Sequence, residues 1–430
     1  MSTQLIAIII LLGTFFGLMF LRTPIAISVG ISCFTTCWYL NIPADIVIQN
    51  AVKGVNGYSL MAVPFFILMG EIMSTGGIAQ RLVNLASSLV GWMRGGLAMV
   101  TVVASMLFGC VSGSSAACTA TLGPIMVPMM KKKGYDEEFA TTITMTSSVT
   151  GLLIPPSHNM VIYAMVAGGV SVGALFMAGV MPGLLMGSLL MAYSYIKARK
   201  KNYPIDGKFD IKKVAQAFVQ AFWGLITIAI VVIGVCTGIV TATESAAVAV
   251  LWALFVTFGI YKEVSIRELP KMVMRAVKTL AMILLLIATS SAFGWLLAYL
   301  KVPQLITRGI FHFSTNPYVV LIIVNVILIL MGMLMDMSSI ILIATPILLP
   351  IATSIGMSPV QFGAMLITNL GVGLLTPPVG GTLFIGSAIS GIKFERLAKT
   401  MIPLYIMMGI TLLLVTYIPQ ISMVLPAFVK

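Results

Sequence analysis

The sequence predicts an all-α integral membrane protein made of two inverted repeats, and three observations support this fold class. Of the 430 residues, 59% are hydrophobic and only 9% are charged, whereas a soluble domain carries roughly 25% charged residues. The motif GLLIPPS at 151–157 returns as GLLTPPV at 373–379, an offset of 222 residues. The basic residues gather on alternate loops, and this bias indicates how each helix crosses the membrane.

The first half, residues 1–200, contains apolar segments and one feature that cannot be two ordinary spans. Residues 95–130 have basic residues at both ends, and two full crossings need about 40 residues plus a turn. We therefore expect a re-entrant hairpin there. The predicted elements are, in order, spans at 4–21, 25–40 and 57–75, hairpin helices at 95–111 and 116–130, a broken helix at 136–168, and a span at 172–196.

The second half, residues 215–430, follows a polar, charged linker at 201–214. It repeats the order of the first half. The predicted elements are spans at 216–238, 243–261 and 279–300, a second hairpin at 317–352, a broken helix at 359–391, and a last span near the C-terminus.

The common offset covers more than the Pro-Pro motif. GPIMVPMMKKKGY (123–135) aligns without a gap to TPILLPIATSIGM (345–357), which matches two prolines and one glycine. A single Pro-Pro match arises easily by chance, but several matches at one offset do not. Self-similarity at a fixed period indicates a structural repeat.

The charges indicate that the two repeats are inverted. If the N-terminus lies outside, the first span ends inside at Arg22, and the second half starts inside. Both termini are then outside. The Lys and Arg residues all lie inside, with four exceptions: Lys53, Lys301, Arg308 and Lys430. Cytoplasmic loops collect Lys and Arg, so the reverse orientation is disfavoured. Repeats that start on opposite sides are inverted, an architecture typical of secondary transporters.

Each Pro-Pro pair interrupts an apolar helix and exposes backbone oxygens. Proline lacks an N–H group and clashes with the carbonyl of residue i−4. A bare carbonyl in the bilayer core costs several kcal/mol unless a partner satisfies it, and a desolvated cation is such a partner. A simple kink packed against neighbouring helices is the structural alternative. The hairpin tips VSGSSAAC (111–118) and LMDMSS (334–339) are polar, so both are expected to face a binding site.

The tip SGSSAA, the two Pro-Pro motifs and MGEIM at 69–73 together resemble the large membrane subunit of tripartite ATP-independent periplasmic (TRAP) transporters, over essentially the whole chain. The resemblance implies an elevator-type transporter with scaffold and transport domains in the bacterial inner membrane. It implies sodium-driven uptake of an organic acid of the sialic acid or C4-dicarboxylate class. It also implies two protein partners, a small four-helix membrane subunit and a periplasmic substrate-binding protein. Na⁺ is the coupling ion, and no other cofactor is expected.

Carried over to this sequence, the resemblance implies three groups of site residues. One sodium ion would be held by the hydroxyls of Ser112 and Ser115 with carbonyls near Thr146, Val149 and Pro155. A second would be held by Gly332, Asp336, Thr368, Gly371 and Pro377. Substrate would lie between the tips, near Ser114, His158, Asn159, Ser338 and Ser339. Whether each ligand is a side chain or a backbone group stays open.

Two other acids lie in apolar segments, where an ionisable residue is a functional candidate. Glu71 is either such a group or the partner of Arg81 or Arg94, and Glu244 is interpreted as structural. Alternatives to the tripartite transporter are a stand-alone ion- or proton-coupled carrier, and an intramembrane enzyme using Glu71 or His158. The sequence has no Walker motif and no hydrolase motif, so ATP drive and enzymatic activity are not expected. The net charge of +13 is attributed to Lys and Arg in cytoplasmic loops that flank the lipid bilayer, and not to binding of nucleic acid.

Overall fold

The computed structural model describes residues 3–21, 23–205 and 209–429. Within these residues every regular element is helical, so the predicted all-α fold is confirmed. The basic residues Arg22 and Lys430, which the orientation argument uses, lie outside the described residues, as does part of the 201–214 linker.

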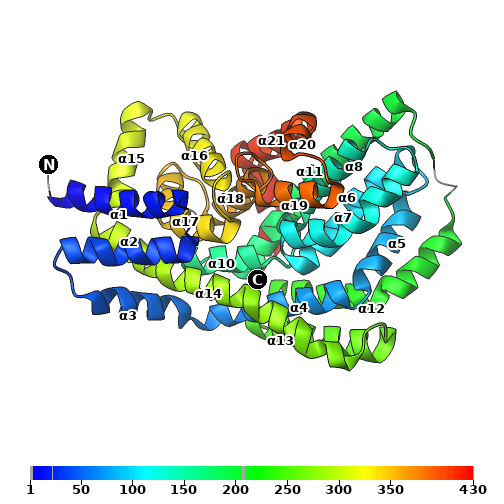
Figure 1. The fold of residues 1–430 in the computed structure, drawn as a ribbon, viewed down its shortest axis with the longest axis horizontal. Coiled ribbons are helices and arrows are strands. Elements are labelled where there is room, and N and C mark those ends of the chain that lie inside the picture. The colour runs from blue at the N-terminus through cyan, green and yellow to red at the C-terminus, as the bar shows by residue number, and fades with distance from the viewer. Residues whose placement is uncertain (1–2, 22, 206–208, 430) are drawn as a thin grey trace.

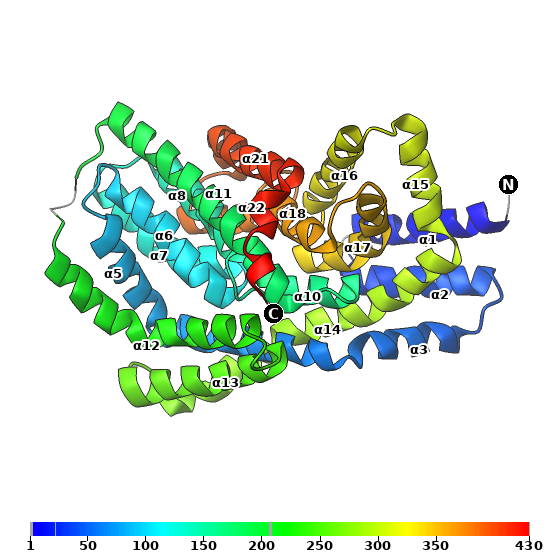
Figure 2. The same ribbon diagram turned by 180° about the vertical axis from the view of Figure 1, so that it is seen from behind.

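One group of helices forms a long, slanted layer, which we call the frame (Figures 1 and 2). The long helix α14 packs against α2, α3 and α4, while α1 packs on α2 and α13 packs on α4 and α12. The frame consists of α1 Thr3–Phe20, α2 Ile25–Tyr39, α3 Ala44–Val55, α4 Ala62–Thr75, α12 Ile211–Cys236, α13 Ala242–Leu254 and α14 Leu269–Tyr299.

A second group lies against the frame and contains both hairpins and both Pro-Pro segments; we call it the tip assembly (Figure 1). In it α6 packs on α7 and α8, and α16 packs on α17 and α18. The tip assembly consists of α6 Gly96–Ser112, α7 Ser115–Lys132, α8 Glu137–Ser148, α9 Thr150–Leu153, α10 His158–Ala167, α16 Pro317–Gly332, α17 Met337–Ser354, α18 Pro359–Gly373 and α19 Gly381–Ser390. The remaining helices connect or flank the two groups: α5 Ile78–Val90, α11 Val172–Lys201, α15 Val302–Phe313, α20 Phe394–Thr400, α21 Ile402–Tyr417 and α22 Pro419–Met423.

Helix boundaries recur at the offset found in the sequence. Ser115–Lys132 and Met337–Ser354 differ by 222 at both ends, and Glu137 and Pro359 begin equivalent helices. The left-handed glycines Gly134 (φ 82°) and Gly356 (φ 89°) also stand at this offset. Both Pro-Pro bonds are cis. The segment from α7 to the start of α8 therefore has the same helix boundaries as the segment from α17 to the start of α18. The inverted repeat of the two whole halves stays a prediction.

The halves meet at equivalent positions. Val149 and Gly371 stand at the offset of 222, and a side chain added at Gly371 would collide with Cγ1 of Val149. A residue that touches its own counterpart lies where the two halves are related to one another, as at the centre of a two-fold interface. This point is next to both helix breaks.

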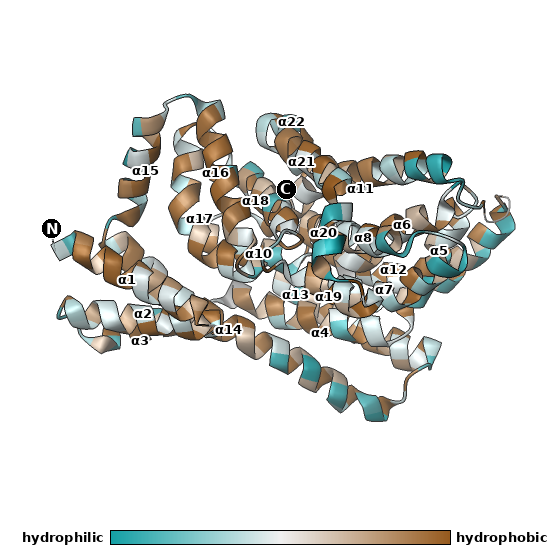
Figure 3. Ribbon diagram, turned by 45° about the horizontal axis from the view of Figure 1, so that its top comes forward, coloured by the Kyte–Doolittle hydropathy of each residue, from teal (hydrophilic) through white to brown (hydrophobic). Residues whose placement is uncertain are grey.

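Helix length and composition fit a membrane protein. Among the described residues, six helices are long and apolar enough to cross a bilayer, or up to nine if each bent pair is one span. Figure 3 shows hydrophobic residues along most helices and hydrophilic residues near the N-terminal end of α14 and around α20. The pair Glu137–Leu153 and His158–Ala167 is bent by 47°, as expected for the first broken helix.

Four regions differ from the predicted elements. Residues 78–90 and 302–313 form amphipathic helices, α5 and α15, where no element was expected. The basic segment that precedes the predicted span 279–300 is helical from Leu269, so α14 is one continuous rod. Helix α11 ends at Lys201 and helix α12 begins at Ile211. The connection between them is therefore shorter than the predicted linker 201–214.

Candidate functional site

The first hairpin tip is a tight turn between α6 and α7. Gly113 ends α6 in the left-handed region (φ 60°), and Ser114 caps α7 by accepting a hydrogen bond from the Ala117 N–H at 3.3 Å. The Ser112 hydroxyl lies 3.3 Å from the carbonyl oxygens of both Gly109 and Ser114, so it braces the turn. Its predicted role as a sodium ligand is therefore in competition with a local structural role.

At the second tip a side chain also caps the second helix of the hairpin, but this side chain is an aspartate. Asp336 caps α17 by accepting a hydrogen bond from the Ser338 N–H at 3.0 Å. Gly332 lets α16 pass close to α18, because a Cβ atom there would lie 2.9 Å from Cα of Gly373. In the first half the matching close approach is between Gly109 and Gly151. Each hairpin is thus held against its own broken helix by a glycine pair.

The two Pro-Pro segments leave backbone oxygens without donors. In the described chain, no hydrogen bond of ordinary geometry reaches the carbonyl oxygens of residues 154–156 or of residues 376–378, although residues 377–379 form a turn. These two triplets stand at the offset of 222, and each includes one predicted ligand, Pro155 or Pro377. Both triplets follow the C-terminal end of a helix, where the backbone carries partial negative charge. Two symmetric sets of unpaired oxygens are what a bound cation needs.

The other predicted backbone ligands are partly engaged. The carbonyl of Thr146 accepts from the Val149 N–H at 3.2 Å, and the Val149 carbonyl accepts from Leu152 at 3.0 Å. The Thr368 hydroxyl donates to the Ala364 carbonyl at 2.7 Å. Each carbonyl keeps a second lone pair. These residues lie beside the breaks and are buried, but the unpaired oxygens of the prolines are the better placed ligands.

A small cavity of about 90 Å³ lies between the tips and the breaks. It brings together predicted residues from both halves, while Ser339 is buried nearby and is not part of its lining. The walls come from the first residues of α7, α10, α17 and α19 and from two leucines before the breaks: Ser114, Ser115, Ala116, Leu152, His158, Asn159, Asp336, Met337, Ser338, Leu374, Gly381 and Thr382.

Four helix N-termini therefore converge on this cavity. A helix N-terminus carries roughly half a positive charge and presents free N–H groups. No Lys or Arg is among the lining residues, and Asp336 already caps one of the four helices. The positive contribution to the potential in this cavity thus comes from the helix N-termini, and the Asp336 carboxylate opposes it. Leu152 and Leu374, which precede the two breaks, also line the cavity.

Hydrogen bonds join the two halves across the cavity. The buried Asn159 side chain donates to the Gly113 carbonyl at 3.2 Å and accepts from the Ser338 hydroxyl at 3.2 Å. One side chain therefore links the first broken helix to both hairpin tips. His158 stands against the first tip, since a Cβ at Gly113 would lie 2.5 Å from its Nδ1 atom.

The Ser115 hydroxyl makes a second link between the two halves, to two residues that were not among the predicted site residues. Its hydroxyl lies 2.5 Å from the Ser148 hydroxyl and 3.1 Å from the Thr382 hydroxyl. Ser157, in the first break, and Thr119, one turn along α7, have buried hydroxyl oxygens without a partner among the described residues. The serines at 148 and 157 fall in the polar TSSVTGLLIPPSHN segment, which was the available signal.

The other intramembrane acids have structural partners. Glu71 pairs with Arg275 and not with Arg81 or Arg94, the partners considered as one of two alternatives from the sequence, and Arg275 also donates to the Thr75 hydroxyl at 3.1 Å. This correction follows from the unexpected helical extension of α14, which carries Arg275 alongside α4. Glu244 forms a capping box with Thr241 at the start of α13, in agreement with its structural interpretation.

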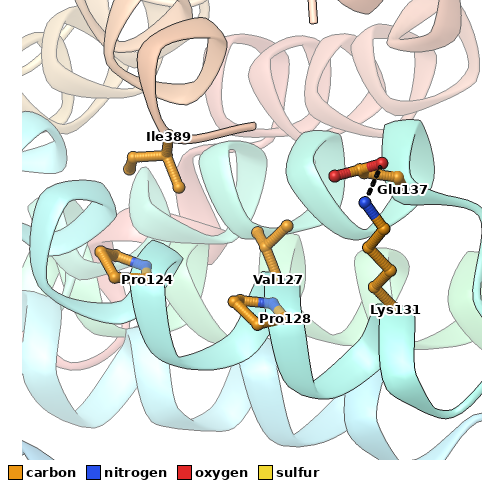
Figure 4. A pocket seen from close by; sticks show the side chains of 6 residues that line it. All are labelled: Pro124, Val127, Pro128, Lys131, Glu137 and Ile389. Carbon is orange, nitrogen blue, oxygen red and sulfur yellow. Dashed lines mark ion pairs between the residues drawn. The ribbon is translucent and has the colours of Figure 1, made fainter. Parts of the chain in front are cut away.

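Another cavity, of about 420 Å³, lies away from the tips between α7, the start of α8 and α19 (Figure 4). Pro124 and Pro128 form one wall, and Ile389 faces them. Lys131 and Glu137 form an ion pair at 2.8 Å at its edge. The two charges at this edge neutralise one another, and the rest of the lining is apolar.

Comparison with known proteins places this arrangement among membrane transporters. The family model of the DctM component of the tripartite ATP-independent periplasmic transporter matches residues 12–421. The C4-dicarboxylate TRAP transporter large permease protein of Rhodobacter capsulatus is 37% identical over 97% of this chain and 98% of its own. The sialic acid TRAP transporter large permease protein of Vibrio cholerae is 35% identical, over 95% of this chain and 96% of its own.

The fold also has a counterpart among solved structures. The Alcanivorax borkumensis YdaH transporter aligns with a TM-score of 0.66 at 12% identity, covering 90% of this chain and 91% of that one. At this identity the likeness concerns the fold alone.

Proposed function

Because the chain belongs to the DctM component family of tripartite ATP-independent periplasmic transporters, we propose that it is the permease subunit that carries an organic acid inward with sodium ions. It is a large permease and not an enzyme of the kind considered from Glu71 or His158. The substrate we propose is an acid of the C4-dicarboxylate or sialic acid class, since relatives with these printed substrates are similarly distant.

The main support for the proposal is the arrangement of helix N-termini and carbonyl oxygens around the central cavity. Four helix N-termini point at one small space, and two sets of unpaired carbonyl oxygens lie at the breaks beside it. Anions are stabilised at helix N-termini, and sodium ions at unwound carbonyls. An anion and cations bound side by side neutralise each other, so each favours binding of the other. This mutual dependence is the physical basis of coupling.

Two protein partners belong to the proposal. A periplasmic binding protein would deliver the acid to the outer face, and a small four-helix membrane subunit would pack on this chain in the inner membrane. The tripartite family name supports a three-part assembly. In an elevator motion the tip assembly would slide against the frame, since both hairpins and both breaks lie in one packed group.

The test is uptake by the complete complex in proteoliposomes. We expect labelled succinate or N-acetylneuraminate to accumulate only with an inward sodium gradient and with the binding protein present. Replacing sodium by choline, at constant ionic strength, serves as the matched control. Equal uptake without sodium would contradict the coupling. Uptake by this chain without the binding protein would favour the stand-alone carrier instead.

A further inference from the structure

A cavity of about 360 Å³ lies where the frame meets the tip assembly. Its frame wall comes from the C-terminal end of α3 and the C-terminal half of α14, and its other wall from α10 and α17. In Figures 1 and 2 these four helices lie together beside the centre of the molecule. Its volume falls within the range of small-molecule sites, about 300–1,000 Å³.

The polar groups in this cavity are donors without partners. Lys53 lines it, and no carboxylate among the described residues pairs with this ammonium group. Ser290 also lines it, and its hydroxyl is buried and makes no hydrogen bond within the described chain. An unpaired cation and an unsatisfied buried hydroxyl facing one space favour an anionic ligand that accepts hydrogen bonds.

The frame wall is fixed by close packing. A Cβ atom on Gly54 would lie 2.8 Å from the Ser291 hydroxyl oxygen, so α3 and α14 touch beside Lys53. The backbone that carries Lys53 is therefore held by two packed helices, while its side chain is exposed and reaches the cavity from the edge.

The cavity and the central site lie along the same helix faces. On α17, Ser338 lines the central site while Leu342 and Pro346, four and eight residues later, line the cavity. On α10, Asn159 lines the central site and Val166 lines the cavity, seven residues later. Residues spaced by four or seven share one helix face. At 1.5 Å per residue, the cavity begins roughly 6 Å from the central site and extends to about 12 Å.

We propose that this cavity is a staging site, in which the carboxylate of the organic acid pairs with Lys53 and the Ser290 hydroxyl before it moves along α10 and α17 to the central site. The inference rests on the proposed function for the identity of the anion. It assigns Lys53, which the charge distribution places on the outer side, a role in substrate capture. The apolar wall residues Ile287 and Leu342 would contact the carbon skeleton.

Charge-selective labelling tests the staging site without any transport assay. Met165, a half-buried lining residue, is changed to cysteine in the full complex. Its modification rate is measured with two thiol reagents of similar size, an anionic sulfonatoethyl and a cationic trimethylammonioethyl methanethiosulfonate. We expect Lys53→Gln to lower the ratio of anionic to cationic rates by about fivefold to tenfold, since a unit charge acts oppositely on the two reagents.

Lys301→Gln is the matched control, because Lys301 is an exposed cation beyond the end of α14 and outside the cavity lining. The unsubstituted chain gives the background from its own buried or partly buried cysteines. A ratio unchanged by Lys53→Gln, or lowered equally by Lys301→Gln, would overturn the proposal. So would complete resistance to both reagents at Met165→Cys and at Ser290→Cys, because a staging site must be reachable from solution.

Uptake supplies the second measurement. With whichever of succinate or N-acetylneuraminate the unsubstituted complex takes up, Lys53→Gln is expected to raise the apparent KM about fivefold and to change the maximal rate less than twofold. Lys53→Arg should retain most of the affinity. An unchanged KM would count against the staging site. If the unsubstituted complex takes up neither acid, the proposed function fails while the labelling result still stands.

Discussion

Ser115 is the point where three segments of the chain meet. Its hydroxyl lies beside those of Ser148 in the first broken helix and Thr382 at the start of α19, which belongs to the other half. Two unpaired hydroxyls, of Ser157 and Thr119, are close in sequence to this cluster. The second break has Val379 at the position equivalent to Ser157. The first proposed sodium site is therefore richer in hydroxyl oxygens than the second.

Ser115→Ala is expected to raise the sodium concentration for half-maximal uptake by about fivefold to tenfold, because the loss of one polar ligand is worth about 1 kcal/mol. The measurement is a sodium titration of uptake in proteoliposomes. Ser32→Ala is the control, since Ser32 is equally buried but bonds only to its own helix, at Val29. An unchanged titration curve would remove Ser115 from the site.

A substitution at Asp336 can distinguish a role in helix capping from a role in ion binding. Asp336→Asn should keep the α17 cap, because asparagine caps helices as well as aspartate does. It should raise the half-maximal sodium concentration severalfold through the loss of one negative charge at the site. Asp210→Asn, a change at the exposed cap of α12, is the control. If both variants behave alike, Asp336 is only a helix cap.

Six of the seven polar residues that line the central cavity were among the predicted site residues, but their contacts were not predicted. Ser114, His158, Asn159, Asp336 and Ser338 were named because the family resemblance implies them, and the fold brings all of them to one cavity. Thr382 was missed because nothing in its neighbourhood shows that α19 packs beside α7, a contact between the two halves. Such pairings depend on the three-dimensional arrangement and not on local pattern.

The hairpins depend on close passage of helices at small residues. Gly109 faces Gly151, and Gly332 faces Gly373, so each hairpin touches its broken helix at the backbone. Small residues allow this approach between helices within a membrane. These glycines set the distance between each tip and its break, and so the geometry of each proposed ion site.

Gly109→Ala should destabilise the protein by about 1–3 kcal/mol, the usual cost of overpacking. The new Cβ atom would lie 2.6 Å from Cα of Gly151, and backbone cannot move aside as a side chain can. The readout is the thermal unfolding midpoint of the detergent-purified complex. Gly409→Ala, on α21 with nothing within 4 Å, should leave the midpoint unchanged or higher. Equal effects of the two substitutions would contradict the packing argument.

Element boundaries were predicted well where apolar segments end in prolines or glycines and poorly where charge and helix coincide. The α6 and α7 hairpin arms were expected at 95–111 and 116–130, near their observed limits. Helix α5 and the basic start of α14 were missed, because exposed amphipathic helices lack the continuous apolar run that marks a span. Arg275 on that extension then reaches Glu71, a partner no sequence pattern indicated.

The orientation of the whole molecule follows from its basic residues. Arg308 on α15 is expected outside and Lys200 at the end of α11 inside, and both are exposed. A membrane-impermeant maleimide should therefore label Arg308→Cys in intact spheroplasts and label Lys200→Cys only after permeabilisation. Labelling of both cysteines from the same side would refute the threading. The inverted relation of the two halves depends on this result.

A pair of density maps of the complete complex, one recorded in sodium and one in choline, offers the sharpest test of paired cation sites at the Pro-Pro segments. In sodium, we expect a spherical density beside the carbonyl oxygens of residues 154–156 and another beside those of residues 376–378. Both densities should be absent in choline. Identical maps, with those oxygens bonded to protein donors and no ion beside them, would contradict it.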